Sequence, residues 1–350
     1  MDDVSYVRNA WYPAAWAEEV TRAPMARTLL GEPVMLYRTQ AGAAVALEDR
    51  CCHKLLPLSM GRIKGDCVEC GYHGMTYDAT GTCVRIPGQP AIPANARVHS
   101  YPVAERLGLV WIWAGEPAAA DESRLFDLPE YRDSDWGVNK GPYTHVRSHY
   151  QNLTDNLLDP AHVSFVHLST LGSADMEEIP VETRRDGAVV EVSRWTLDKP
   201  PVPIFEKFAD FPGNVDRWQY YYFHPPSINV VDFGAGEVGM GHDEADRAEG
   251  VRIHSCHFLA PESERSTHYF WMQVRNFAPA DETVSAEITG QFVLAFDEDK
   301  AILEAVQASE DASPGRPPVK LKIDKGPSQS RRIVERMIRD EQTAAAEAAE

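Results

Sequence analysis

The stretch that decides the fold is Cys51-Cys52-His53 together with Cys70-Gly71-Tyr72-His73, which gives Cys-x-His, sixteen intervening residues, and Cys-x-x-His. One cysteine and one histidine from each half fit a 2Fe–2S centre of the Rieske type, in which two thiolates hold one iron and two neutral imidazoles hold the other. The imidazoles raise the reduction potential from roughly −400 mV to about −150 to +300 mV, which suits a centre that accepts electrons from a flavin or a plant-type ferredoxin.

A structural zinc site is the alternative for the same residues. Cys67-x-x-Cys70 has zinc spacing, and four Cys/His ligands would complete a tetrahedron. Zinc modules usually pair two compact Cys-x-x-Cys or His-x-His clusters, whereas the first half here offers only Cys51, Cys52 and His53. The pattern therefore favours the iron–sulfur centre.

Length and charge bound the remaining possibilities. The 350 residues exceed what one hydrophobic core usually serves, so two domains are expected. A net charge of −19 argues against binding to nucleic acid or an anionic membrane, but leaves room for an anionic small substrate. Met1–Ser5 begins no signal peptide, and the chain has no long apolar run. Four of the six cysteines lie at positions 51–70, which indicates reduced metal chemistry, so we expect a cytoplasmic protein.

The first third of the chain reads as short strands joined by tight turns. Arg27–Leu30 and Val34–Arg38 are β-prone runs on either side of Gly31-Glu32-Pro33, and Leu109–Trp113 ends the series. Such runs predict a small all-β domain over residues 1–115, with both Cys/His pairs on its loops. The change in composition at residues 114–121 marks the boundary to a second domain over 116–350.

The second domain is predicted to be α+β, with antiparallel strands between helical segments. A helical stretch is expected near Tyr150–Leu168, and a charged C-terminal helix over Ser330–Glu350. The strands are expected at Ala188–Trp195, Trp218–Val231, Val251–Leu259 and His268–Phe277.

Asp159-x-x-His162-x-x-x-x-His167 is the second dense group of potential metal ligands. Residues five apart on one helix point about 140° away from each other, so both histidines can face one metal only if the helix breaks. Pro160 predicts such a break, with Asp159 capping a new helical turn. Alternatively, one histidine is a buried core residue and the other lies on the surface.

A third potential ligand is the acid on an apolar helical stripe. Positions 292, 295, 296, 299, 302, 303 and 306 share one face, and Asp299 is their single charged residue. A buried carboxylate costs several kcal/mol unless a metal or a cation pairs with it, so the alternative is a buried arginine partner. Asp297 and Glu298 fall off the stripe and are expected to face solvent. Two histidines and one aspartate would form the facial triad of non-haem Fe(II) oxygenases.

With both sites in one chain, the sequence resembles the oxygenase subunits of Rieske non-haem iron oxygenases, most of all the vanillate O-demethylase group, with the dicamba demethylase and toluene-sulfonate monooxygenase oxygenases as relatives. The resemblance covers nearly the whole chain. Many relatives have proline where Cys52 and Gly71 stand here. The residues that carry the resemblance are 9–12, 51–74, 86–89, 101–106, 155–159 and 329–332.

The resemblance implies two iron sites and a helix-grip, START-like catalytic domain. It assigns the 2Fe–2S cluster to Cys51, His53, Cys70 and His73, and the mononuclear Fe(II) to His162, His167 and Asp299. It also implies a homotrimer in which electrons come from NAD(P)H through a separate flavin/ferredoxin-type reductase.

Four further residues acquire roles from the same resemblance. Asp159 matches a carboxylate that bridges a cluster histidine of one subunit and an iron ligand of the next, although it could also be only a helix cap. Asn156 matches a residue close to the iron, with a hydrogen bond inside the helix as the alternative. His257 and Asn229 match polar contacts to substrate, although His257 could equally be a buried core histidine.

The function implied is a terminal oxygenase that uses O2 to hydroxylate or O-demethylate a small, anionic aromatic substrate, such as a vanillate-like methoxybenzoate. An aryl sulfonate or another ring substrate is an alternative. Two other classes stay open, namely an electron carrier without oxygenase activity and a zinc-stabilised binding protein. The carrier would have no use for Asp299 on a buried stripe.

Overall fold

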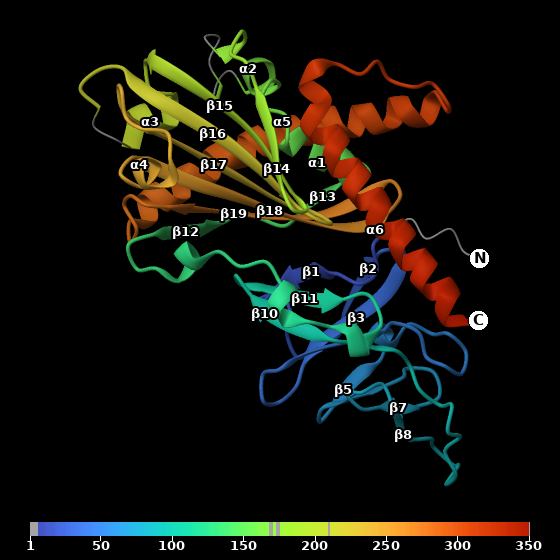
Figure 1. Ribbon diagram of the computed structural model, residues 1–350. Helices are drawn as coiled ribbons and strands as arrows, with labels where there is room; N and C mark the ends of the chain where they lie inside the picture. Colours follow the sequence, from blue (N-terminus) through green and yellow to red (C-terminus); the bar gives the residue numbers. More distant parts are fainter. Residues whose placement is uncertain (1–5, 168–170, 173–175, 209–210, 350) are drawn as a thin grey trace. The chain divides into compact units, whose positions relative to one another are not determined.

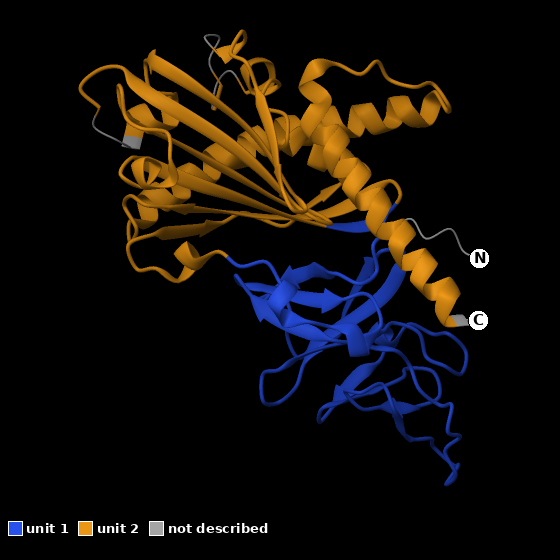
Figure 2. Ribbon diagram, viewed as in Figure 1, with its two compact units in different colours: residues 1–127, 260–263 blue, residues 128–259, 264–350 orange. Residues whose placement is uncertain are grey.

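The structure is a computed structural model that describes residues 6–167, 171–172, 176–208 and 211–349. The chain separates into two compact units, residues 1–127 with 260–263 and residues 128–259 with 264–350 (Figure 2). The division at residue 115 stays a prediction; the structure places its own division after Asp127. In the described part of the chain no helix is both long enough and apolar enough to cross a membrane.

The first unit consists of three small antiparallel sheets, with strand orders β1-β11-β10, β2-β3-β4-β9 and β5-β6-β7-β8. The two-residue turn between β2 and β3 is made by Leu30 and Gly31, both with positive φ, as tight hairpins require. The strands are β1 (Trp11–Trp16), β2 (Met25–Leu29), β3 (Glu32–Arg38), β4 (Ala44–Glu48), β5 (Arg62–Lys64), β6 (Cys67–Glu69), β7 (Thr76–Tyr77), β8 (Cys83–Arg85), β9 (Ser100–Tyr101), β10 (Val103–Arg106) and β11 (Leu109–Trp113).

The second unit is built on one antiparallel sheet of eight strands, ordered β12-β19-β18-β17-β16-β15-β14, with β13 also paired to β19 (Figure 1). Its strands are β12 (Gly137–Lys140), β13 (Thr144–Val146), β14 (Glu182–Asp186), β15 (Val189–Lys199), β16 (Val215–His224), β17 (Ile228–Glu237), β18 (Val251–Ser263) and β19 (Ser266–Arg275). Its helices are α1 (Tyr150–Leu157), α2 (Val163–Val166), α3 (Pro203–Phe208), α4 (Glu244–Ala248), α5 (Glu282–Ala312) and α6 (Lys325–Ala349).

The predicted α+β class is confirmed, but the prediction of one strand over Trp218–Val231 is wrong. The segment contains Pro225-Pro226, and the chain turns there, so that β16 and β17 form a hairpin. Neither proline has a backbone N–H for a sheet ladder, which explains why the strand ends at this point. The ends of the expected helices at Leu168 and Glu350 lie outside the described residues.

The long helix α5 packs against one face of the large sheet and forms the core of this unit. Phe292, Ala295 and Phe296 are buried against sheet residues that include Phe233 and Trp271. Of the predicted stripe, positions 292, 295, 296, 299 and 303 are buried, as expected. The prediction is wrong for Ile302 and Val306, which are 43% and 41% exposed, while Gln307 is buried instead.

Candidate active site

The two Cys/His pairs lie on two loops of matching construction. In the first loop the carbonyl of Cys51 accepts a hydrogen bond from the N–H of Leu55, and in the second the carbonyl of Cys70 accepts one from Gly74, at 2.9 and 3.0 Å. Leu55 and Gly74 both have positive φ, so each loop reverses four residues after its cysteine. Each loop therefore contributes one thiol and one imidazole: Cys51 and His53 from the first loop, and Cys70 and His73 from the second.

The four side chains meet as two separate pairs. The thiols of Cys51 and Cys70 are buried and close enough to interact, while the exposed imidazoles of His53 and His73 have ring centroids 4.7 Å apart. A single zinc ion would draw all four ligand atoms within about 4.6 Å of one another. Among the described residues, the one group of three or more potential ligand atoms within 4.8 Å lies elsewhere. The arrangement fits two irons, one on each pair, better than one zinc ion.

Tyr77, at the end of β7, contacts the buried side of this site. Its hydroxyl lies 3.1 Å from the sulfur of Cys51 and 3.2 Å from that of Cys52. Burial raises the pKa of the phenol, so its proton stays in place at neutral pH. When Cys51 is a thiolate, Tyr77 is therefore the hydrogen-bond donor.

The second group of ligands depends on the predicted break in the helix. α1 ends at Leu157, and α2 begins at Val163, so His162 and His167 lie at either end of one short helical turn. The expectation that Asp159 caps that turn is wrong, because His162 occupies the N-cap position. The carboxylate of Asp159 instead accepts the N–H of Ala161 at 2.7 Å, within the loop that follows α1.

His162, His167 and Asp299 come together with their ligand atoms within 4.8 Å of one another. Oδ1 of Asp299 lies 3.1 Å from Nε2 of His167 and 3.7 Å from Nε2 of His162. The amide of Asn156 donates to the same carboxylate oxygen at 3.2 Å. Two imidazole nitrogens and one carboxylate oxygen form a donor set that fits ferrous iron with open coordination positions.

Each of the two imidazoles has a hydrogen-bond partner at Nδ1, the nitrogen that does not face the other ligands. Nδ1 of His162 lies 2.5 Å from the backbone carbonyl of Asp159, and Nδ1 of His167 lies 2.9 Å from Oε2 of Glu298. These contacts place the proton on Nδ1 and leave Nε2 of each ring for the metal. Burial lowers the pKa of His162, which favours the neutral, ligating form. Asp297 is exposed as expected, whereas Glu298, also expected to face solvent, is 30% exposed and has one carboxylate oxygen on Nδ1 of His167.

The triad lines a cavity inside the second unit. Four phenylalanine rings also line that cavity, and β18 contributes Ser255 and His257. His257, which the resemblance predicts to contact substrate, lines the same cavity as the triad. Asn229 is paired with His257 across β17 and β18, but its amide points to Thr154 at 3.5 Å, and it is not among the residues that line the cavity.

These two sites, a mixed Cys/His cluster site and a two-histidine, one-carboxylate site, define the class of oxygenases that combine a Rieske centre with a mononuclear non-haem iron. Comparisons with known proteins agree. Residues 10–102 match the Rieske [2Fe-2S] domain, and residues 146–340 match the vanillate O-demethylase oxygenase C-terminal domain. The chain belongs to the vanillate O-demethylase family of Rieske oxygenase components.

Individual relatives are similar over nearly their whole length. The toluene-4-sulfonate monooxygenase iron-sulfur subunit of Comamonas testosteroni is 39% identical over 96% of this chain and 98% of its own. A vanillate O-demethylase oxygenase subunit of a Pseudomonas species is 35% identical over 97% of both chains. The crystal structure of dicamba monooxygenase bound to 3,6-dichlorosalicylic acid is 31% identical, with a TM-score of 0.89 over 97% of this chain and 99% of that one.

Proposed function

We propose that this oxygenase component acts on a small aromatic anion, and that with a methoxybenzoate it removes the methyl group as formaldehyde. In that reaction one oxygen atom of O2 enters a methyl C–H bond, the other leaves as water, and two electrons and two protons are consumed. The hemiacetal collapses to a phenol and formaldehyde. The observation that carries the proposal is the cavity itself, which joins the triad to walls rich in phenylalanine, including Phe205, Phe233, Phe292 and Phe296.

The residues around the irons have distinct proposed roles. Cys51, His53, Cys70 and His73 hold the cluster, and His162, His167 and Asp299 hold the mononuclear iron. The bound irons supply electron storage and dioxygen activation. Asn156 orients the carboxylate of Asp299 through its 3.2 Å hydrogen bond. His257 contacts the substrate, and Asn229 supports the same wall from the adjoining strand.

Electrons are proposed to come from NAD(P)H through a separate flavin/ferredoxin-type reductase and to pass between subunits of a homotrimer. Support comes from the surface around Asp159, whose side chain is 26% exposed. Asp159 lines a groove of about 700 Å³ together with the exposed apolar side chains of Ile302, Val306 and Val319. Exposed apolar residues around an acidic side chain suit a protein partner, here the cluster-bearing end of a second copy.

The activity is tested with the iron-loaded protein, a reductase of this class, NADH and O2. With 4-methoxybenzoate we expect formaldehyde in proportion to the NADH consumed. Asp299→Ala should keep the visible spectrum of the cluster but lose the mononuclear iron and the formaldehyde. A cluster that is reduced normally, with no product from any methoxyarene, aryl sulfonate or other ring substrate, would favour the electron carrier.

The bridging role of Asp159 has its own test. Asp159→Asn keeps the backbone carbonyl that holds His162 and, because an asparagine side-chain oxygen can also accept the Ala161 N–H, keeps the loop. We expect both metal sites to remain occupied and the trimer to remain intact, while reoxidation of the reduced cluster in a single turnover slows strongly. Unchanged reoxidation would leave Asp159 with a structural role only.

A further inference from the structure

A single phenol hydroxyl connects an exposed cysteine with a buried one at the first cluster loop. Tyr77 is fully buried, and its hydroxyl lies 3.1 Å from Sγ of Cys51 and 3.2 Å from Sγ of Cys52. The two cysteines are neighbours in the chain but differ in their surroundings, since Cys51 is 2% exposed and Cys52 is an exposed residue. The contacts therefore form a chain from Cys52 at the surface through Tyr77 to the buried Cys51.

The direction of the inner contact follows from the number of protons. Burial raises the pKa of Tyr77, so its hydroxyl keeps one proton at neutral pH and has one hydrogen bond to donate. A cysteine that holds an iron is a thiolate, which accepts hydrogen bonds and has none to donate. The third sulfur near this hydroxyl, Sδ of Met75, is 3.8 Å away and belongs to a neutral thioether, which is a weak acceptor. The phenol proton is therefore directed to Cys51.

In the outer contact Tyr77 must then be the acceptor. With its proton directed to Cys51, the oxygen of Tyr77 offers only lone pairs to Cys52. A thiol that binds no metal is mostly protonated at neutral pH, and its S–H is a weak donor. Among the described residues, Sγ of Cys52 has no hydrogen-bond partner other than this oxygen. The thiol of Cys52 is therefore the donor to Tyr77.

Two hydrogen bonds in sequence strengthen each other. Donation from Cys52 polarises the phenol, so the hydrogen bond from Tyr77 to the sulfur of Cys51 becomes stronger, by about 10–30% in such chains. The same S–H also keeps the hydroxyl of Tyr77 from turning its proton toward Cys52. Because a hydrogen bond to a ligand sulfur stabilises the reduced, more negative cluster, Cys52 is placed to raise the reduction potential through Tyr77.

The alternative role for an exposed cysteine beside a cluster ligand is to bind iron itself. The two thiolates of a Rieske centre hold the same iron, so their sulfurs must lie close together. Cys51 is buried and close enough to Cys70 to interact with it, whereas Cys52 is exposed and has its sulfur at the hydroxyl of Tyr77. These contacts favour Cys51 as the ligand and Cys52 as the hydrogen-bond donor.

We propose that Cys52 is a positioning residue of the 2Fe–2S centre, whose thiol directs and strengthens the hydrogen bond from Tyr77 to Cys51. The inference rests on the proposed role of Cys51 as a cluster ligand. It concerns a feature of this chain in particular, because many relatives have proline at position 52, and proline has no side-chain donor. The property that Cys52 adjusts is the reduction potential of the cluster.

Three variants test the chain of hydrogen bonds. Cys52→Ala removes the outer donor, and Cys52→Ser replaces it by a hydroxyl that can donate to the same oxygen. Cys52→Ala combined with Tyr77→Phe shows whether Cys52 acts through the phenol. Cys67→Ala is the matched control, because Cys67 is a partly exposed cysteine of the same unit that makes no hydrogen bond with Tyr77 in the described part of the chain.

The measurement is anaerobic redox titration of the iron-loaded protein followed by circular dichroism, and the visible spectrum shows that each variant holds the cluster. We expect Cys52→Ala to lower the midpoint potential through about a two-fold to four-fold change in the reduction equilibrium, which is about 20–35 mV at 59 mV for a tenfold change. Cys52→Ser should recover at least half of this loss. In the Tyr77→Phe background Cys52→Ala should add no further shift, and Cys67→Ala should leave the potential unchanged.

An unchanged or raised potential in Cys52→Ala would overturn the positioning role, as would an equal shift with and without the hydroxyl of Tyr77. Loss of the cluster spectrum in Cys52→Ala would also overturn it, because Cys52 would then be an iron ligand. The proposed function is judged separately. Formaldehyde release by the unmodified protein with no shift in Cys52→Ala rejects only the positioning role, whereas the expected shifts without formaldehyde release reject only the demethylation.

Discussion

Oε2 of Glu298 lies 2.9 Å from Nδ1 of His167, although the two residues are 131 positions apart. The neighbouring residue, Asp299, meets Nε2 of the same ring at 3.1 Å. Two successive acids of α5 therefore contact both nitrogens of one imidazole: Glu298 contacts Nδ1, and Asp299 contacts Nε2, the nitrogen left for the metal. The contact fixes the ring plane and the tautomer, and it makes Glu298 part of the iron site.

Glu298→Ala should weaken ferrous iron binding by about ten-fold to a hundred-fold, the usual cost of losing the partner behind a metal ligand. The measurement is the iron retained during titration with a chelator, with the cluster spectrum as an internal reference. Asp297→Ala is the matched control, since Asp297 is the preceding acid on the same helix and is exposed. Equal iron affinity in the two variants would show that His167 needs no support from Glu298.

Tyr77→Phe should lower the reduction potential of the cluster. The hydroxyl of Tyr77 lies 3.1 Å from the sulfur of Cys51, and a hydrogen bond to a ligand sulfur stabilises the reduced, more negative cluster. Loss of that bond should shift the midpoint by on the order of 50 mV, since a one-electron couple moves by 59 mV for a tenfold change in equilibrium. Redox titration followed by circular dichroism measures the shift.

The control for that shift is Tyr37→Phe. Tyr37 is a buried tyrosine of the same unit, but its hydroxyl donates to the backbone carbonyl of Asp66. Loss of this hydroxyl should affect stability and leave the potential unchanged. An equal shift of the midpoint potential in both variants would show that altered packing, and not the hydrogen bond to Cys51, causes the shift.

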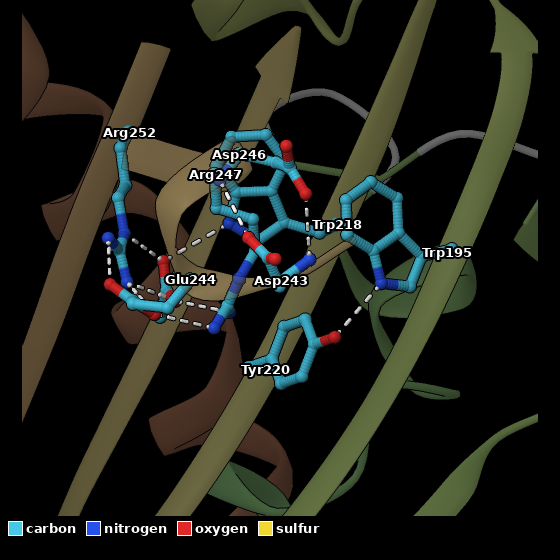
Figure 3. A network of polar contacts seen from close by, with 9 residues as sticks. Trp195, Trp218, Tyr220, Asp243, Glu244, Asp246, Arg247 and Arg252 are labelled. Atoms are coloured by element: carbon cyan, nitrogen blue, oxygen red, sulfur yellow. Dashed lines mark hydrogen bonds and ion pairs between the residues drawn. The ribbon is translucent and has the colours of Figure 1, made fainter. Parts of the chain in front are cut away.

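Asp232→Asn should destabilise the second unit. In the network that includes Arg247 and Arg252 (Figure 3), the buried carboxylate of Asp232 accepts hydrogen bonds at 2.8 Å from both guanidiniums and one from Trp218 at 3.1 Å. Asparagine removes the buried anion between the two cations and leaves them only Glu244, whose side chain is 65% exposed. Loss of one partner of a buried ion pair costs about 3 kcal/mol of unfolding free energy.

Urea unfolding followed by tryptophan fluorescence measures that loss. Glu249→Gln is the control, because this exposed acid follows α4 in the chain and has no part in the network. An Asp232→Asn midpoint equal to that of the control would mean that solvent or a rearranged side chain replaces the missing charge.

His224→Gln should reduce the acid sensitivity of the protein. Burial lowers the pKa of His224 to about 4, below its usual value of about 6.5. The unfolded chain therefore takes up a proton before the folded protein does, and stability that is present above pH 6.5 is lost as the pH falls toward 4. Between pH 6.5 and pH 5 the loss from this residue is about 2 kcal/mol.

The comparison is the urea midpoint of the unmodified protein and of His224→Gln at both pH values. The unmodified protein should lose more stability on acidification, because glutamine does not titrate. If both proteins lost the same stability on acidification, the acid sensitivity would come from other titratable groups and not from His224.

Several features followed from the sequence alone because they depend on local spacing. The Cys51–His73 pattern predicted the cluster site, since the pairs Cys-x-His and Cys-x-x-His each fit a single tight loop. Pro160 predicted the break between α1 and α2, and the lone acid on the α5 stripe identified Asp299. In each case the residues that carry the signal lie within one turn or on one helical face, so the prediction needed no knowledge of contacts between distant parts of the chain.

Tertiary structure alone decided which distant residues complete these sites. The contact between His167 and Glu298 joins two elements that no periodicity relates, so the sequence predicted solvent exposure for Glu298 and did not reveal its hydrogen bond to His167. The buried hydrogen bonds from Arg275 to Asn139 and from Asn139 to Gln273 likewise depend on the pairing of β12 with β19. The physical reason is that a hydrogen bond depends on distance and direction in space, and antiparallel pairing brings together side chains whose separation along the chain carries no signal.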